Sequence, residues 1–568
     1  MGFSTLSSMK ECSGNLLTRL TTAIFPYGFK TELKDLLVIS WPIMLTVVLQ
    51  FTVVLVSTAF CGHIGKDALD GVGLANSVIN MVGTSVMLGM ATSLETLLAQ
   101  LFGSEYKKRI GLVLQRGFLV MLLAYIPIAT VLLNTEHILV AIGQNRTVAR
   151  LGGQYTTVLL AGVLGDVGRV VAQIYLQSQN IVFPSLIVEV VANILNVCYH
   201  YIFIFVLDLG VIGAGIAVTL TFWTEAIICF LYVKITGMYK ETWSGFSKEC
   251  LTDWKEFLDL AVPGIFLVAL EWWSFEIFVV ISGLLGEVQL AAQTVMWMIN
   301  SAVFSIFLGL SIATCVKVGN HVGAGNVEAA ITTSRVAALT SFVVGSTVSI
   351  FLLIFKDLLP KAFSSDPEVI ELISSLMPLM ARNCIFDSMQ ITLGGVIRGI
   401  GYQTYGAFIM VLGHYVVALP IGIPLALCTS LQVSGIWLGL LVGLILQCIL
   451  YGAKILSINW KELCEQVQMT FNLAEASEKI SYGLTFPKGD RELEDEVFEQ
   501  DYHAIFDLDN RTSRDNYISV LKQRFLLLIS FVFVLAGGII LRVYLDKKAS
   551  CTSFHCFTNS TMINSTVY

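Results

Sequence analysis

Acidic side chains lie in the middle of long apolar stretches of this chain, where a charge is costly. Glu271 and Glu276 share one stretch, and Asp387 lies in a later one. An ionised group at the centre of a membrane-spanning helix costs roughly 2.5–3.5 kcal/mol, so such groups usually serve a function or are paired. We therefore expect these three carboxyls to form a site for a proton or a cation.

The spacing of Glu271 and Glu276 indicates that they point in different directions. Five positions correspond to about 140° around an α-helix, so the two cannot share one narrow face of a regular helix. We expect one of them to face a central cavity and the other to face neighbouring helices, unless the helix bends at Pro263.

Further ionisable residues lie in apolar stretches of the first half. Asp166 and Arg169 stand three positions apart, where opposite charges meet on a helix, so we expect a neutralising internal pair. Glu95 lies near the end of its stretch and is either functional or merely hydrated. For Glu189 and Glu225 we expect structural roles or side chains that reach the membrane surface.

Tryptophans flank the acids. Trp272 and Trp273 adjoin Glu271, and Trp297 lies in the next stretch. Most such residues pack or face lipid, but a cavity that combines a carboxylate with indole faces suits a lipophilic organic cation. A carboxyl group away from water can also exchange protons near neutral pH. One acid that holds either a proton or a cation would suffice for antiport, and we expect Glu271 to be that acid.

Nothing in the sequence predicts an enzyme. A Walker A motif is missing, so direct use of ATP is not expected, and neither is any other cofactor. The histidines lie mostly in loops or near the ends of apolar stretches, and the cysteines lack metal-ligand spacing, so no metal site is predicted. Nothing suggests nucleic-acid binding.

The elements that must position these residues are membrane spans. Of the 568 residues 55% are hydrophobic and only 13% charged, whereas soluble domains carry about 25% charge. A span needs roughly 20 apolar residues. Thirteen stretches qualify: 36–60, 74–101, 112–133, 155–176, 184–207, 211–233, 258–282, 290–316, 335–355, 370–396, 406–427, 434–456 and 525–545.

The first twelve spans form two matching halves. Pro42 and Pro263 are 221 positions apart, and Gly62–Gly65 repeats at the same offset as Gly283–Gly286. Because each copy holds six spans, both enter the membrane from the same side. We therefore expect an all-α polytopic membrane protein of two six-helix bundles related by a parallel pseudo-two-fold repeat, with a binding site between them. Subtracting 221 maps Asp387 onto Asp166 and Glu271 onto Gln50, a neutral amide of similar size that we expect to take part in proton or substrate binding.

Lys and Arg predict the orientation. Loops after even-numbered spans carry ten of them, counting Arg116, Lys317 and Arg398, and loops after odd-numbered spans carry five, so the N-terminus is expected in the cytoplasm. The tail then lies outside a plasma membrane, where Asn559 and Asn564 are glycosylation acceptors. The expected divisions are a cytoplasmic arm (1–35), an N-terminal lobe (36–234), an amphipathic cytoplasmic connector (235–256), a C-terminal lobe (257–456), an acidic, mostly disordered cytoplasmic segment (457–524), the thirteenth span (525–545) and an extracellular tail (546–568).

Several segments resemble the multidrug and toxic compound extrusion (MATE) family, and its vertebrate proton-coupled branch in particular. They are, in chain order, Cys61–Gly65, Glu271–Trp273, Val318–Gly325, Gly394–Gly401 and Pro420–Ile423. The resemblance implies a V-shaped fold, alternating access, an extra C-terminal span, and efflux of organic cations in exchange for protons. It places the family's functional acids on Glu271, Glu276 and Asp387.

The chain also departs from that pattern. The vertebrate branch has a further acid in span eight, where this chain has Met298, and Asp166, Arg169 and Glu189 are not part of the family pattern. Three alternatives to a proton-coupled antiporter stay open: sodium coupling, a lipid-linked saccharide flippase, and an uncoupled channel or scaffold. We expect the chain to work as a monomer on small organic cations in a lipid bilayer.

Overall fold

The computed structural model describes residues 28–481, 537–539 and 542, and the described part is helical without strands. Twelve of its helical stretches are long and apolar enough to cross a membrane. They correspond to the first twelve predicted spans, which confirms that prediction. The thirteenth span (525–545) lies mostly outside the described residues, and Asn559 and Asn564 lie wholly outside them.

The N-terminal lobe contains the first six spans. Its elements are α2 (Phe29–Ile64), α3 (Lys66–Val78), η1 (Ile79–Thr84), α4 (Ser85–Gly103), η2 (Lys107–Arg109), α5 (Ile110–Leu133), α6 (Thr135–Ala141), α7 (Arg146–Ser178), α8 (Phe183–His200), η3 (Tyr201–Val206) and α9 (Gly210–Thr236). Two short helices follow in the connector, α10 (Tyr239–Thr242) and η4 (Lys248–Leu251).

The C-terminal lobe contains the other six spans. Its elements are α11 (Trp254–Leu285), α12 (Glu287–Gly323), α13 (Val327–Ile354), α14 (Leu359–Phe363), α15 (Pro367–Gly399), α16 (Gln403–Met410), η5 (Val411–Ala418), α17 (Leu419–Cys428) and α18 (Val433–Ser457). A last described helix, α19 (Trp460–Ser481), follows the twelfth span.

The sequence repeat is visible in the backbone. Positive φ angles, which side chains rarely adopt, recur at equivalent positions of the two lobes. The pairs are separated by 221, 221 and 222 positions: Gly65 (154°) with Gly286 (138°), Asn180 (61°) with Gly401 (84°), and Gly210 (54°) with Gln432 (47°). Because the turns between spans match as well as the spans, the structure confirms a duplicated bundle in parallel orientation.

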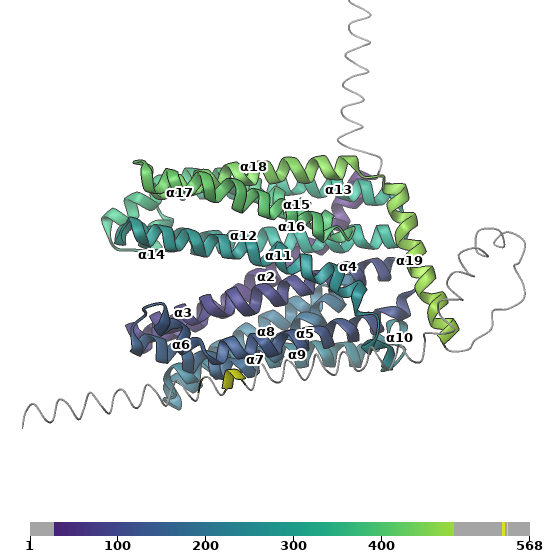
Figure 1. Cartoon of the computed structure of the whole chain (residues 1–568), viewed down its shortest axis with the longest axis horizontal. Coiled ribbons are helices and arrows are strands. Elements are labelled where there is room, and N and C mark those ends of the chain that lie inside the picture. The colour runs from purple at the N-terminus through teal and green to yellow at the C-terminus, as the bar shows by residue number, and fades with distance from the viewer. Residues whose placement is uncertain (1–27, 482–536, 540–541, 543–568) are drawn as a thin grey trace, which may run out of the picture.

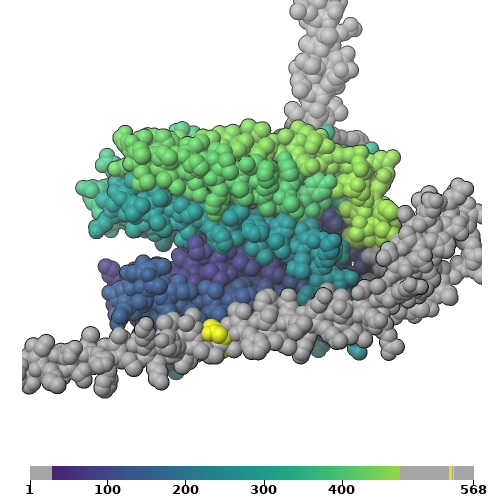
Figure 2. All heavy atoms as spheres, in the orientation of Figure 1, coloured from purple at the N-terminus to yellow at the C-terminus, as the bar shows by residue number. Residues whose placement is uncertain are grey.

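The two lobes form a V. Figure 1 shows them apart at the end where α3, α6 and α14 lie, and together at the end where α4, α12 and α19 meet. Figure 2 shows the hollow between them opening at the first of these ends. We call the second the closed end. The lobes touch where α2 packs on α12 and α4 packs on α11.

Glycines allow this close approach. A Cβ at Gly89 of α4 would overlap the backbone of Ile265 in α11, and one at Gly309 of α12 would overlap the backbone of Met44 in α2. Met44 and Ile265 are themselves 221 positions apart, so the two helix crossings are equivalent in the repeat. Small residues at such crossings bring membrane helices into contact.

Helix α19 differs from the disorder expected over 457–524. Its apolar residues fall at helical spacing, which gives it a face that must be covered. Trp460, Leu463 and Cys464 pack into a buried cluster of the C-terminal lobe, and Phe471 packs into that of the N-terminal lobe. The helix therefore lies across both lobes at the closed end, as Figure 1 shows. Residues 482–524 lie outside the described part of the chain.

The few described residues near the C-terminus contact the N-terminal lobe. Asn134 Nδ2 donates to the Gly538 carbonyl at 3.2 Å. Arg542 Nη1 donates to the Leu133 carbonyl and to Thr157 Oγ1, both at 2.9 Å. These contacts place this part of the chain beside α5 and α7.

Candidate functional site

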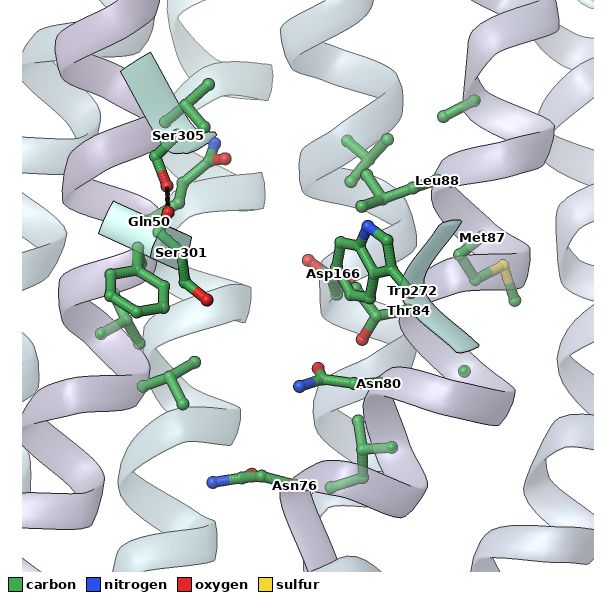
Figure 3. Close-up of a pocket in the computed structure, with 18 of the residues that line it drawn as sticks. Gln50, Asn76, Asn80, Thr84, Met87, Leu88, Asp166, Trp272, Ser301 and Ser305 are labelled. Atoms are coloured by element: carbon green, nitrogen blue, oxygen red, sulfur yellow. Dashed lines mark hydrogen bonds between the residues drawn. The ribbon is translucent and has the colours of Figure 1, made fainter. Parts of the chain in front are cut away.

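A cavity of about 390 Å³ lies between the lobes, lined by residues from both. Figure 3 shows Gln50, Ser301 and Ser305 on one side of it, and Asn80, Thr84 and Trp272 on the other. These sides correspond to the two helix crossings, α2 with α12 and α4 with α11. The wall combines amides and hydroxyls with eight aromatic side chains: Phe51, Tyr155, Phe222, Trp272, Trp273, Phe275, Trp297 and Phe304.

The charges on this wall are mostly negative. Among the described residues, four carboxyl groups line it, Glu95, Asp166, Glu225 and Glu276, against one guanidinium group, Arg169. A concave site with an excess of negative charge raises the local concentration of cations. The cavity therefore has the electrostatics and the aromatic surface that suit an organic cation.

Glu276 is the cavity carboxylate without a protein partner. It lies half-buried on α11, and no hydrogen bond or ion pair to it is found among the described residues. Its neighbour Phe275 stacks with Trp297 of α12 at a centroid distance of 4.5 Å. Trp273 Nε1 donates to the Met81 carbonyl of the opposite lobe at 3.0 Å. Glu276 is thus a free acid set among fixed aromatic rings.

Glu271 faces the interior of the C-terminal lobe. It is buried, is not among the described residues that line the cavity, and its Oε1 accepts from Gln390 Nε2 at 3.1 Å. The same Nε2 lies 3.4 Å from Asp387 Oδ1. In the described part of the chain no Lys or Arg pairs with either acid. One face of α11 therefore presents Glu276 to the cavity, and the other presents Glu271 to α15, in keeping with their angular separation.

In the N-terminal lobe, Arg169 gathers three carboxylates. Its Nε lies 2.8 Å from Asp166 Oδ1 and 3.2 Å from Glu225 Oε2, and its Nη1 lies 3.7 Å from Glu189 Oε1. The Asp166–Arg169 pair that the sequence suggested is present. The structure adds Glu189 and Glu225, which are buried and do not reach a membrane surface.

Amides complete this N-terminal cluster. Gln50 Nε2 donates to Gln173 Oε1 at 2.9 Å and to Glu189 Oε1 at 3.0 Å. Gln173 Nε2 donates to Glu189 Oε1 at 2.7 Å, and Arg169 Nη1 donates to Gln173 Oε1 at 3.1 Å. The cluster joins α2, α7, α8 and α9 into one polar network.

The two lobes carry different charges at equivalent positions. An offset of 221 maps Gln50, Asp166 and Arg169 onto Glu271, Asp387 and Gln390. The N-terminal set holds one acid and one base, whereas the C-terminal set holds two acids and no base. The duplication has thus left a carboxylate cluster held by an arginine in one lobe and an acidic pair without a base in the other.

A further ion pair joins the lobes at the base of the cavity. Arg398 Nη1 of α15 donates to Glu95 Oε2 of α4 at 3.2 Å, and both side chains are at most one-tenth exposed. Closer to the chain start, Glu32 of α2 pairs with Lys317 of α12 at 3.5 Å. The prediction that Arg116, Lys317 and Arg398 lie in loops is wrong. All three are buried on helices, because acidic partners within the protein pair with their charges.

Sequence reasoning missed Gln173, Gln390 and Arg398. Gln173 stands four positions after Arg169, and Gln390 stands three positions after Asp387. Residues at these spacings are neighbours on a helix, so helical spacing could have indicated both. The repeat could also have drawn attention to Gln390 as the counterpart of Arg169. Arg398 gave no such signal, because its partner Glu95 lies 303 positions away.

Comparisons with known proteins agree with this architecture. The MatE family model matches residues 42–202 and 263–423, two segments that are themselves 221 positions apart. Multidrug and toxin extrusion protein 1 of Oryctolagus cuniculus is 37% identical over 92% of this chain and 95% of its own length. The protein of the same name from Homo sapiens is 38% identical over 78% of each chain.

Solved structures agree as well. The eukaryotic MATE transporter AtDTX14 superposes with a TM-score of 0.75 at 27% identity, covering 78% of this chain and 99% of that one. A MATE structure in a bent conformation superposes with a TM-score of 0.68 at 19% identity, which supports the fold alone. The chain belongs to the MatE family of multidrug and toxin extrusion transporters.

Proposed function

We propose that the protein is a secondary active multidrug efflux transporter that exchanges organic cations for protons. The observation that carries this proposal is the cavity between the lobes, where the unpartnered Glu276 lies among indole and phenyl rings. A carboxylate and aromatic faces together bind a lipophilic cation by charge pairing and cation–π attraction. The relatives' names, which say multidrug and toxin extrusion, agree with such cargo.

Proton coupling is assigned to Glu271 and Asp387. The two buried acids approach one amide donor, Gln390, and no base hydrogen-bonds to either among the described residues. Keeping both charged in a low-dielectric interior is costly, and binding one proton lowers that cost by removing the repulsion between the two negative charges. In this scheme the C-terminal lobe exchanges protons while the cavity-facing Glu276 holds the cation. This moves the expected cation contact from Glu271 to its neighbour one and a half turns along α11.

The lobes are expected to alternate between two arrangements around the cavity. Without the buried Arg116, Lys317 and Arg398, seven loop Lys and Arg residues remain on the side of the closed end against five on the other side, so we propose that the closed end faces the cytoplasm. The structure then corresponds to a state open to the outside of a plasma membrane, with the N-terminus inside and the C-terminus outside. We propose that a monomer is functional, because both lobes that line the described cavity belong to the same chain, and that the proton gradient is the energy source.

Uptake into proteoliposomes tests this function. With an acidic interior and potassium as the only inorganic cation, labelled tetraethylammonium should accumulate, saturate with concentration, and exchange with unlabelled tetraethylammonium on the far side. Accumulation that requires sodium would establish the sodium-coupled alternative. Flux that neither saturates nor exchanges would indicate an uncoupled channel and refute antiport.

The saccharide flippase is disfavoured by the charges of the cavity. A pyrophosphate group needs free cationic side chains. Arg169, the one basic residue among the described residues of the wall, is already paired with Asp166, Glu189 and Glu225.

A further inference from the structure

The Glu95–Arg398 ion pair links the cavity to the closed end. Glu95 is on the cavity wall, and Arg398 is not among the described residues that line it. Glu95 Oε2 accepts from Arg398, whereas no partner for Oε1 is found in the described part of the chain. One carboxylate oxygen therefore ties the lobes together while the other is free to meet a ligand.

Further hydrogen bonds join the two lobes beside this ion pair. Thr96, next to Glu95, donates through Oγ1 to the Arg398 carbonyl at 2.8 Å. Gln100 Nε2, one turn further along α4, donates to the Gly399 carbonyl at 2.9 Å. Gln403 Nε2 donates back across the interface to Thr96 Oγ1 at 2.7 Å. The junction is a buried polar seam between α4 and the end of α15, and it must separate if the closed end opens.

We propose that Glu95 is a second cation-binding carboxylate of the cavity, and that a cation bound there competes with Arg398 and favours separation of the lobes at the closed end. The inference rests on the proposed function, because it requires the cavity to take a cation. It goes beyond that function by assigning the trigger for the conformational change to the N-terminal lobe.

A cation at Glu95 would act through its different affinities for the two states of the lobes. A ligand shifts a conformational equilibrium only by as much as it prefers one state. While Glu95 is paired with Arg398, its charge is largely neutralised and attracts a cation weakly. When the lobes part, Arg398 leaves with α15 and the full carboxylate charge becomes available. A cation at the base of the cavity therefore binds more tightly to the state in which the closed end is open.

The position of Glu95 suits this role better than those of the other cavity acids. Asp166 and Glu225 are paired with Arg169 of their own lobe, so binding to them does not change a contact between lobes. Glu276 has no partner among the residues that the structure describes, so it has no contact between lobes to release. Of the four acids on the described wall, Glu95 is the one whose ion pair crosses from one lobe to the other.

Cys315 provides a native reporter for this opening. It lies fully buried on α12, with its thiol against Thr96 of the opposite lobe. A protein in which the other eleven of the twelve cysteines are replaced would carry a single thiol at the seam. Its rate of reaction with a water-soluble maleimide then measures how often the closed end opens. Purified protein in nanodiscs gives the reagent access to both sides.

The proposal predicts a specific pattern of labelling rates. Tetraethylammonium should speed labelling of Cys315 in the single-thiol protein by about fivefold or more, the usual lower range for coupled sites. Glu95→Gln should label fast without the cation and show no further response to it. Glu328→Gln, a matched change on an exposed acid of α13 at the same end, should label slowly and respond normally.

Two controls keep the test decisive. If Glu95→Gln does not fold because Arg398 is left buried and unpaired, Glu95→Gln/Arg398→Gln replaces both charges and should show the same fast, cation-independent labelling. Slow labelling that still responds to tetraethylammonium in either variant would overturn the proposal. So would a protein that transports tetraethylammonium while Cys315 labelling ignores it. Failure of the proposed function would appear separately, as absence of transport in the unmodified protein.

Discussion

Glu276→Gln isolates the charge that we assign to cation binding, because glutamine keeps the size and hydrogen-bonding ability of the side chain. Two unit charges about 4 Å apart attract by about 1 kcal/mol in water and about 4 kcal/mol at an effective dielectric constant of 20. The cavity opens to solvent at one end, and Glu276 is only half-buried, so a loss of about 1–2 kcal/mol is expected. That loss corresponds to a roughly 5- to 30-fold weaker Kd for tetraethylammonium.

Equilibrium binding to the purified protein measures this effect without requiring transport. Scintillation proximity with labelled tetraethylammonium would give Kd for the wild-type protein, for Glu276→Gln and for Glu276→Asp. The aspartate variant keeps the charge and should stay within a few-fold of the wild type. An unchanged Kd in Glu276→Gln, with the protein folded and monodisperse, would refute the assignment of Glu276 as the cation contact.

Three further changes follow from the same structure. Gln390→Arg gives the C-terminal lobe the base that its counterpart Arg169 supplies to the other lobe. Accumulation driven by the pH gradient should be lost, while tetraethylammonium binding should remain. Retained accumulation would contradict the assignment of proton coupling to the unpaired acids of this lobe. Arg169→Gln leaves three carboxylates without their base and should lower the free energy of unfolding by about 3–5 kcal/mol. A thiol-dye assay should show this as a lower melting temperature. An unchanged melting temperature would show that the cluster is not an ion-pair network. Phe471→Ala removes a buried contact of α19, and truncating a core phenylalanine costs about 3–5 kcal/mol of stability. Because α19 lies across both lobes, the closed end should then open more often and Cys315 should label faster. An unaltered rate would mean that α19 does not hold the lobes together.

The global fold was predictable because its signals are local or strictly periodic. Apolar length fixed the twelve spans, and the constant offset between Pro42 and Pro263 fixed their grouping into two lobes. The angle between Glu271 and Glu276 also followed from helix geometry. Each of these inferences needs only neighbouring residues or a repeated pattern.

The arrangement of the site was less predictable, because its contacts join residues far apart in the chain. Helical spacing cannot tell which of Glu271 and Glu276 faces the cavity, since that depends on how α11 rotates against α4 and α15. Arg398 reads as a loop cation at the end of an apolar stretch, and its burial is explained only by Glu95 of the other lobe. Helix α19 was obscured by the acidic composition of the segment that it begins.

The most direct test of the account is the coupling of Glu271→Gln. In proteoliposomes with an acidic interior, this variant should not concentrate tetraethylammonium, because the C-terminal lobe has lost one of the acids that exchange protons. It should still exchange labelled for unlabelled tetraethylammonium across the membrane, since the cavity and Glu276 are intact. Uphill accumulation at the wild-type level would contradict the central claim that the acidic pair of the C-terminal lobe couples transport to protons.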